Sequence, residues 1–120
     1  MISGKTRVNI RPFEIQDLAW LKPIADAYHE WDDFIHVLQR KVVVTAFVVP
    51  GKALAILFKD DGRYIAAGIT GRQGIKDFIR MSKTCLEPLH EMEIPIFHYQ
   101  NVGPWHKKLY RQLGVKEVER

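Results

Sequence analysis

Cysteines, long apolar runs and low-complexity tracts are scarce in this sequence. Cys85 is the single cysteine of 120 residues, which rules out an internal disulfide and fits a reducing compartment. No apolar run approaches the roughly 20 residues that a membrane span needs, and residues 1–10 hold no apolar block of a secretory signal. We therefore expect a soluble protein without membrane contact, located in the cytoplasm.

Neither repeats nor linkers divide the chain, so its length predicts a single domain over residues 1–120. Apolar residues make up 47% of it, which is enough for a core in a domain of this size. The net charge of +4 suits the phosphates of a nucleotide-type ligand, nucleic acid or an acidic partner, or it only aids solubility. His29 and His36 flank Asp32 and Asp33 at a spacing that matches no established metal site. No metal is predicted, and these acids are interpreted as a solvated helix face.

Hydrophobic periodicity and turn residues predict the element order β-α-α-β-β-β-α-β-α-β. Strands are predicted over residues 5–11, 42–49, 53–58, 63–69, 94–99 and 115–118, and helices over residues 17–28, 31–39, 74–92 and 104–113. Pro23 and Pro88 are expected to break or distort their helices. Short connections predict an antiparallel meander over residues 42–69, and the following strand–helix–strand unit predicts a parallel pair. The fold class is therefore α/β, with a mixed sheet and helices on its faces.

A strand that leads into a glycine turn at the start of a helix forms the clearest candidate site. Helix N-terminal amides and the helix dipole favour anions, and glycine lets a phosphate approach the backbone. The pattern predicts a phosphate-bearing ligand, held by Gly71, Arg72, Gln73, Gly74, Ile75 and Lys76. The alternative is an ordinary helix start with solvated bases. A basic stripe that continues through Arg80 and Lys83 could follow a nucleic-acid backbone. Such a stripe is usually a solvated face, so nucleic acid is not the expected partner.

Three parts of the chain carry a family resemblance. Residues 9–12 (Asn-Ile-Arg-Pro), followed by Asp17 and Leu18, are similar to the opening strand and first helix of one superfamily. The meander, glycine turn and long helix are similar to its acyl-CoA-binding region, and residues 109–115 (Leu-Tyr-Arg-Gln-Leu-Gly-Val) to its tail motif. Over nearly its whole length the chain thus resembles the GCN5-related N-acetyltransferase superfamily. The resemblance implies that fold, acetyl-CoA as cofactor and acetyl transfer to an amine of unknown identity.

The resemblance also implies roles for single residues. Tyr110 takes the position of the acid that protonates the leaving thiolate, and a backbone N–H of Gly68 or Ile69 takes that of the carbonyl-polarising group. His98 is the best candidate for the base, because an unperturbed histidine titrates near neutral pH. The alternatives are a helix-edge Tyr110 with its hydroxyl in water, a Gly68 that packs under a helix, and a buried structural His98.

Two departures from the family pattern leave a second function open. The phosphate motif of the family is Gln or Arg, two residues, Gly, one residue, then Gly or Ala. In one register this chain has Gly71, Gly74 and Lys76 and keeps only the middle glycine, and in a second register it has Ile69, Arg72 and Gly74 and keeps only the last position. The family also adds a further strand beyond the last one predicted here, which a partner subunit could supply. We therefore expect a homo-oligomer or another protein partner. The alternative function is a non-catalytic structural or binding protein. Short members of this kind resemble acetyltransferase-like proteins of tailed phages, some of which are virion components.

Overall fold

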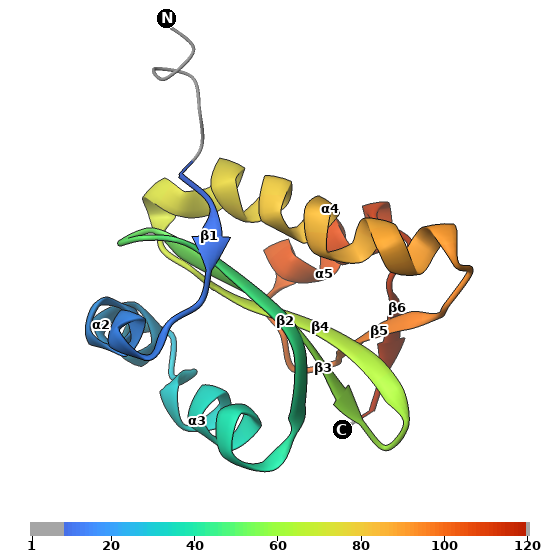
Figure 1. Ribbon diagram of the computed structural model, residues 1–120, viewed down its shortest axis with the longest axis horizontal. Helices are drawn as coiled ribbons and strands as arrows, with labels where there is room; N and C mark the ends of the chain where they lie inside the picture. The colour runs from blue at the N-terminus through green and yellow to red at the C-terminus, as the bar shows by residue number, and fades with distance from the viewer. Residues whose placement is uncertain (1–8, 120) are drawn as a thin grey trace, which may run out of the picture.

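Six strands form one mixed sheet among residues 9–119, the part of the chain that the computed structural model describes (Figure 1). The strands are β1 (Arg11–Pro12), β2 (Val42–Val49), β3 (Ala53–Asp60), β4 (Arg63–Thr70), β5 (Ile96–Tyr99) and β6 (Lys116–Val118). The helices are α2 (Leu18–Ala27), α3 (Trp31–Arg40), α4 (Ile75–Glu91) and α5 (Pro104–Gln112), with 3₁₀ turns η1 (Ile15–Asp17) and η2 (Arg72–Gly74).

The spatial order of the strands follows the chain from β1 to β6. Strands β1 to β4 pair antiparallel, which confirms the meander, and β4 with β5 and β5 with β6 pair parallel. Asp61 and Gly62 both have positive φ (53° and 76°), the conformation that a two-residue hairpin needs to match the strand twist. The mixed sheet and the element order agree with the sequence prediction.

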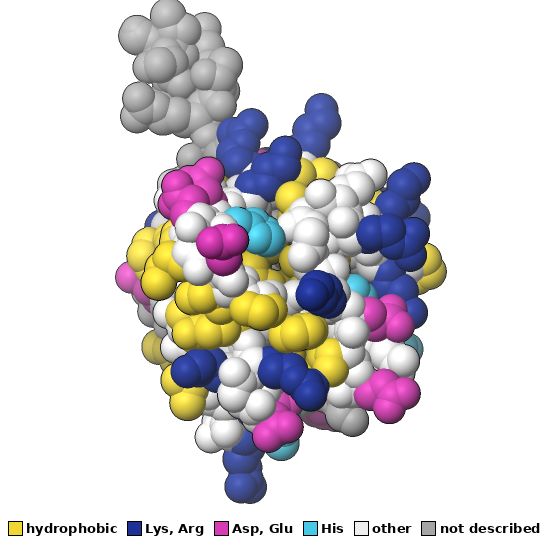
Figure 2. All heavy atoms as spheres, turned by 90° about the vertical axis from the view of Figure 1, so that its right-hand side faces the viewer, with side chains coloured by type: hydrophobic (Ala, Val, Ile, Leu, Met, Phe, Trp, Pro, Cys, Tyr) yellow, Lys and Arg dark blue, Asp and Glu magenta, His cyan; other side chains and the backbone are white. Residues whose placement is uncertain are grey.

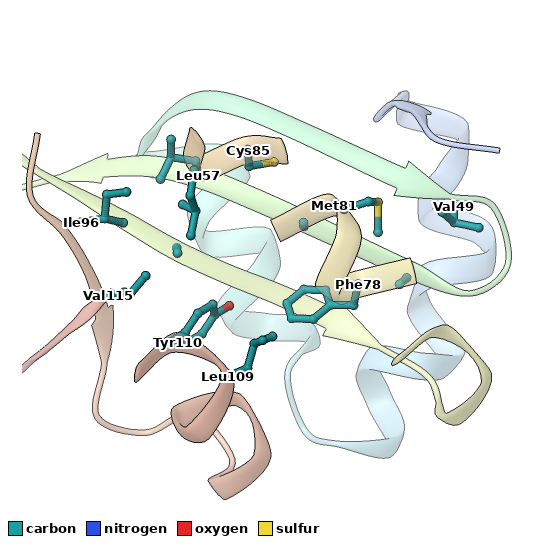
Figure 3. Packing of buried hydrophobic residues seen from close by; sticks show 13 residues of the cluster. Val49, Leu57, Phe78, Met81, Cys85, Ile96, Leu109, Tyr110 and Val115 are labelled. Carbon is teal, nitrogen blue, oxygen red and sulfur yellow. The ribbon is translucent and has the colours of Figure 1, made fainter. Parts of the chain in front are cut away.

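Helices cover both faces of the sheet and enclose two apolar clusters. Leu21 and Ala25 of α2 and Phe34 and Val37 of α3 pack on one face. Helices α4 and α5 pack on the other, where Phe78 lies close to Leu109 and Tyr110 and Met81 belongs to the same apolar cluster (Figure 3). Cys85 is buried in this second cluster, as its place on an apolar stripe predicted. None of the helices within residues 9–119 is long and apolar enough to cross a membrane.

Three prolines lie in the helices and the first strand. Helices α2 and α4 continue past Pro23 and Pro88 to Ala27 and Glu91, close to the predicted ends, so Pro23 does not break α2. Both prolines are exposed, so water can solvate the carbonyl that each leaves without a helical donor. Strand β1 includes Pro12, where the prediction stopped, because an edge position tolerates the missing N–H. Residues 5–8 of that predicted strand lie outside the described residues.

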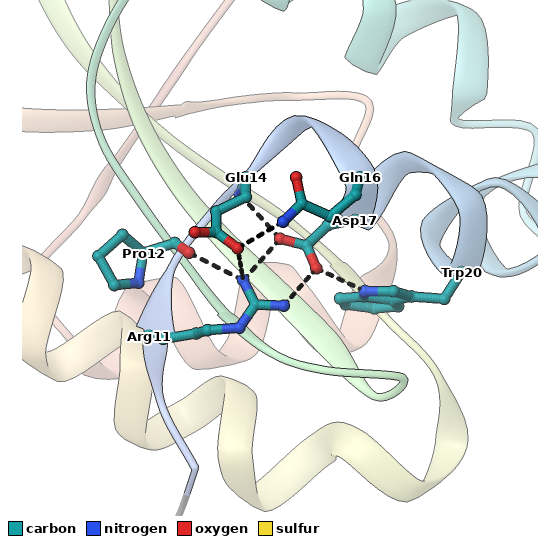
Figure 4. Close-up of polar contacts among 6 residues, drawn as sticks. All are labelled: Arg11, Pro12, Glu14, Gln16, Asp17 and Trp20. Carbon is teal, nitrogen blue, oxygen red and sulfur yellow. Dashed lines mark hydrogen bonds and ion pairs between the residues drawn. The ribbon is translucent and has the colours of Figure 1, made fainter.

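Asp17 joins β1 to α2 through its buried carboxylate (Figure 4). Its side chain is 1% exposed and accepts hydrogen bonds from both terminal nitrogens of Arg11 (2.6 and 2.9 Å). The Glu14 amide and the Trp20 indole N–H also donate to it, both at 2.8 Å. The hydrogen bonds from Arg11 lower the pKa of Asp17 to about 2, against the opposing effect of burial. Asp17 precedes α2 as predicted, but its carboxylate caps no helical amide and instead binds backward to Arg11.

Replacing Asp17 by Asn should destabilise the fold. The substitution keeps the shape but removes the charge that Arg11 and two N–H donors share. We expect the free energy of unfolding to fall by about 2 kcal/mol, the range for hydrogen bonds to a charged group when one partner is part-exposed. Urea denaturation measures it, with Asp26→Asn as the control, because Asp26 pairs with Lys22 on the exposed surface. Equal losses in both variants would contradict a structural role for the buried carboxylate.

The same carboxylate predicts an acid limit of stability. Because the folded-state pKa lies below the ordinary value of 3.8, the stabilisation is present above that value and is lost as the pH falls toward 2. Denaturation midpoints measured from pH 5 to pH 2 should fall more steeply for the natural chain than for Asp17→Asn. Parallel pH profiles would exclude Asp17 as a source of the acid limit.

Candidate ligand-binding cleft between two diverging strands

Strands β4 and β5 separate soon after they meet. They pair only at Tyr64 with Ile96 and at Ile65 with Phe97, whereas β4 continues to Thr70 in register with β3. Beyond Phe97, β5 stays beside β6 instead. Residues 66–70 of β4 therefore have no partner on the β5 side. The resulting gap lies at the carboxyl ends of two parallel strands, which is where open α/β sheets bind ligands.

A cavity of about 590 Å³ occupies this gap. Residues 28–30, from the connection between α2 and α3, and Asp33, from the first turn of α3, line it from one face of the sheet. The β4–α4 turn contributes residues 70–72 and Ile75, and residues 101–106 lead from β5 into α5. A second cavity of about 90 Å³ adjoins the first, since Glu30, Asp33 and Asn101 line both. The cleft is thus reached by side chains from both faces of the sheet.

Unsatisfied polar atoms gather around the cleft. Within residues 9–119, Thr70 Oγ1, His106 Nε2 and the Tyr110 hydroxyl are the buried side-chain polar atoms without a hydrogen-bond partner. Thr70 and His106 line the larger cavity, and burial lowers the pKa of His106 to about 4. Buried polar groups nearly always have a partner. Thr70 and His106 thus place unsatisfied polar atoms beneath the wall of the larger cavity.

Glu30 is the titratable group best placed in the cleft. It directly precedes α3 and lines both cavities. Burial, together with the negative charge of Asp33, raises the pKa of Glu30 to about 7. A carboxyl that titrates near neutral pH can accept a proton from a reacting group. The sequence analysis missed this residue, because it interpreted the neighbouring acids as a solvated face. Its place between two helices that pack on one sheet face was the available signal.

Three of the six predicted phosphate-binding residues line the larger cavity: Gly71, Arg72 and Ile75. Gln73 and Lys76 are exposed and line neither cavity described above. The Gly71 amide donates to the Lys52 carbonyl (3.1 Å), and the Gly74 amide donates to the Gly71 carbonyl (3.0 Å). These two amides are therefore engaged within the protein, and Arg72 is the cation that the turn presents to the cavity.

Close packing against Lys52 leaves no room for a side chain at Gly74. A Cβ at this position would lie 2.4 Å from the Lys52 carbonyl oxygen, closer than any side chain allows. Gly68 is in a similar position, because a Cβ there would lie 2.0 Å from the Phe78 ring. Gly68 also lines the smaller cavity, together with Ile69. Gly68 thus both packs closely under α4 and lies in the wall of the cleft.

The structure brings together the two side chains predicted to be catalytic. His98 and Tyr110 stack with ring centroids 5.2 Å apart and an interplanar angle of 26°. They are 3% and 1% exposed, and neither lines the two cavities of the cleft. The alternative of a helix-edge Tyr110 with its hydroxyl in water is therefore wrong. Burial and then the negative charge of Glu30 raise the pKa of Tyr110, so this hydroxyl keeps its proton at neutral pH.

On the face shown in Figure 2, Lys and Arg side chains lie at the top and along the right-hand edge, and acidic and hydrophobic side chains lie among them. Such cations are not specific to nucleic acid, because a charged face is usually only solvated. Within residues 9–119, no group of three His, Cys, Asp or Glu side chains is arranged to hold a metal ion.

Comparisons with family models, curated proteins and solved structures find no match for this chain. Its function therefore has to be argued from the chemistry of the cleft itself.

Tyr110→Phe should stabilise the protein. The substitution removes a buried hydroxyl that has no partner, so we expect the free energy of unfolding to rise by up to about 1 kcal/mol. The matched control is Tyr99→Phe, which removes a hydroxyl that donates to Asp60 and should destabilise by about 1 kcal/mol. Chemical denaturation of both variants measures the difference. A loss of stability in Tyr110→Phe would show that this hydroxyl is paired in solution.

Proposed function

We propose that the protein transfers an acyl group from acyl-CoA to an amine, with the two substrates meeting in the gap between β4 and β5. The observation that carries the proposal is the β4 edge from residue 66 to residue 70, which has no partner on the β5 side. Residues 67–69 of this edge line the smaller cavity, and Thr70 lines the larger one. Two substrates that approach from opposite faces would meet there. The family resemblance of the sequence points to the same reaction.

The cleft suits the acyl-bearing arm of coenzyme A better than its diphosphate. A cavity of about 590 Å³ is within the range of small-molecule sites. The pantetheine arm carries two amides, for which the unpaired β4 edge, Thr70 and His106 supply polar partners. At the other end, the Gly71 and Gly74 amides donate within the protein. Arg72 would hold the diphosphate through its guanidinium group, which binds phosphate oxygens in pairs.

Glu30 replaces His98 as the proposed proton acceptor, because it lines the cavity and His98 does not. When bound, acetyl-CoA would supply the acyl group as a thioester, whose carbonyl carbon bonds to the amine nitrogen while its bond to sulfur breaks. Glu30 takes the proton that the amine loses. Tyr110 is not assigned the role of acid, because it is 1% exposed and lines neither cavity. The leaving thiolate would take its proton from solvent, and Glu30 would return the proton of the amine to solvent.

The engaged Gly71 and Gly74 amides favour a second function, a non-catalytic binding protein of the same fold. Without those two amides, diphosphate binding relies on fewer contacts, and a ligand held in the cleft need not react. This alternative predicts that the cleft binds a small molecule but that no acyl group is transferred. Turnover of acetyl-CoA in the presence of amines decides between the two functions.

Glu30→Gln should abolish transfer without weakening acetyl-CoA binding. Glutamine keeps the shape but cannot accept a proton, so we expect kcat to fall by about 100-fold or more with KM for acetyl-CoA unchanged. In the natural chain, kcat should rise with pH through about 7 as Glu30 loses its proton. Release of the free thiol measures the rate, and a rate that is independent of pH between 6 and 8 would exclude Glu30 as the base.

Asp32→Asn is the matched control for Glu30→Gln. Asp32 lies on the first turn of the same helix, is exposed and lines neither cavity of the cleft. The variant changes the net charge by the same amount and should keep the natural kcat. If both variants lose activity equally, the effect comes from the overall charge and not from Glu30.

Arg72→Gln should weaken acetyl-CoA binding by about tenfold, the loss of one charged contact to phosphate. Arg80→Gln is its control, because Arg80 is an exposed cation of the same helix region that lines neither cavity of the cleft. Isothermal titration calorimetry with acetyl-CoA and with CoA measures both variants. Absence of binding to the natural chain at millimolar acetyl-CoA would overturn the acyltransferase proposal.

A further inference from the structure

We propose that the amine acceptor is a small monoamine with a short branched apolar body and no carboxylate, whose ammonium group lies beside Glu30 and whose body fills the smaller cavity. The inference rests on the proposed acyl transfer for its reaction. It names the substrate class of the same cleft, and the selectivity that it predicts can be measured without acyl transfer.

The lining of the smaller cavity separates an apolar end from a polar end. Its apolar wall comes from both the helix layer and the sheet, and includes Phe34, Val37, Leu54, Ile56 and Phe58. The polar residues Glu30, Asp33 and Asn101 line both cavities, so they lie where the two cavities join. A ligand with one polar group therefore places that group at the junction and its hydrocarbon body in the smaller cavity.

The size of the smaller cavity limits the hydrocarbon body. Its volume is about 90 Å³, whereas an engineered protein cavity of roughly 150 Å³ binds benzene. By this scale the cavity holds about four carbon atoms, which is the size of an isobutyl group. An aromatic ring or a long chain does not fit without rearrangement of the wall.

The charge at the junction selects the polar group. Glu30 lines it, and among residues 9–119 no basic residue lines the smaller cavity. A carboxylate on the ligand would be repelled there, whereas an ammonium group would be attracted. Within the larger cavity, Tyr28, His29, Arg72 and His106 are the other ionisable side chains in the lining. An ammonium held by Glu30 would lose its proton to that carboxylate before it reacts.

Thr70 provides an observation independent of the acidic side chains. It is 9% exposed and lines the larger cavity with Glu30, and its Oγ1 has no hydrogen-bond partner. A hydroxyl both accepts and donates, so it can pair with an amine N–H or with the amide that forms from it. Thr70 and Glu30 thus line the same cavity, and the unsatisfied hydroxyl lies beneath its wall.

Isothermal titration calorimetry of the full chain with three probes tests the inference. The probes are 3-methylbutylamine, leucine, which adds only an α-carboxylate to it, and 1,4-diaminobutane, which puts a second ammonium where the branched end would lie. We expect 3-methylbutylamine to bind at least about tenfold more tightly than leucine, because like charges oppose each other at the junction. We expect 1,4-diaminobutane to bind comparably weakly, since its second charge would be buried among apolar side chains.

Two variants locate the binding. Glu30→Gln should weaken 3-methylbutylamine about tenfold or more, whereas Asp32→Asn should leave its affinity unchanged. Equal affinities for 3-methylbutylamine and leucine, or no effect of Glu30→Gln, would overturn the inference, as would no binding of the amine. Acetyl-CoA is titrated separately. If acetyl-CoA fails to bind while the protein still prefers 3-methylbutylamine to leucine, the acyl-transfer proposal is wrong and the amine-site proposal is supported. If acetyl-CoA binds and 3-methylbutylamine does not, the amine-site proposal is wrong, whereas the acyl-transfer proposal is not affected.

Discussion

Two parallel strands share a hydrogen-bond ladder only while they stay about 5 Å apart, and β4 and β5 keep this spacing for two residue pairs. The cleft depends on the loss of that ladder. Its backbone edge, its access from both faces and the meeting of three connections all follow from the separation beyond Ile65 and Phe97. Gly68 helps to shape the cleft. The Phe78 ring of α4 occupies the space where a side chain of residue 68 would lie, and this packing holds α4 close against β4.

Two carboxyl groups show how position alone separates a structural role from a chemical one. Asp17 and Glu30 both lie in the N-terminal third of the chain, next to helices that cover the same sheet face. Asp17 accepts hydrogen bonds from Arg11 and two further donors, which lower its pKa to about 2. It therefore stays ionised at neutral pH and does not exchange a proton there. Glu30 is instead partly buried beside the negative charge of Asp33, and burial and this charge raise its pKa to about 7. The first carboxylate holds the chain together, and the second can exchange a proton.

Local patterns predicted the architecture well and the cleft less well. Alternation and turn residues are properties of neighbouring positions, so the meander, the parallel pair and the helices at residues 31–40 and 75–91 could be read from the sequence. Pro23 does not break its helix, because the cost of a helical proline depends on whether water reaches the freed carbonyl. The cavity residues Glu30, Thr70 and His106 come from three distant segments. No sequence pattern links them, because their proximity arises only when the sheet forms.

The contact between Gly74 and the Lys52 carbonyl bears on how glycine motifs in such turns are interpreted. The turn between β2 and β3 rests against this glycine, so selection for a stable fold is enough to preserve it. A descendant of this chain that had lost every nucleotide ligand would still keep Gly74. Its neighbour Arg72 has no such packing constraint, so it is the position that would drift first once phosphate recognition ceased to matter.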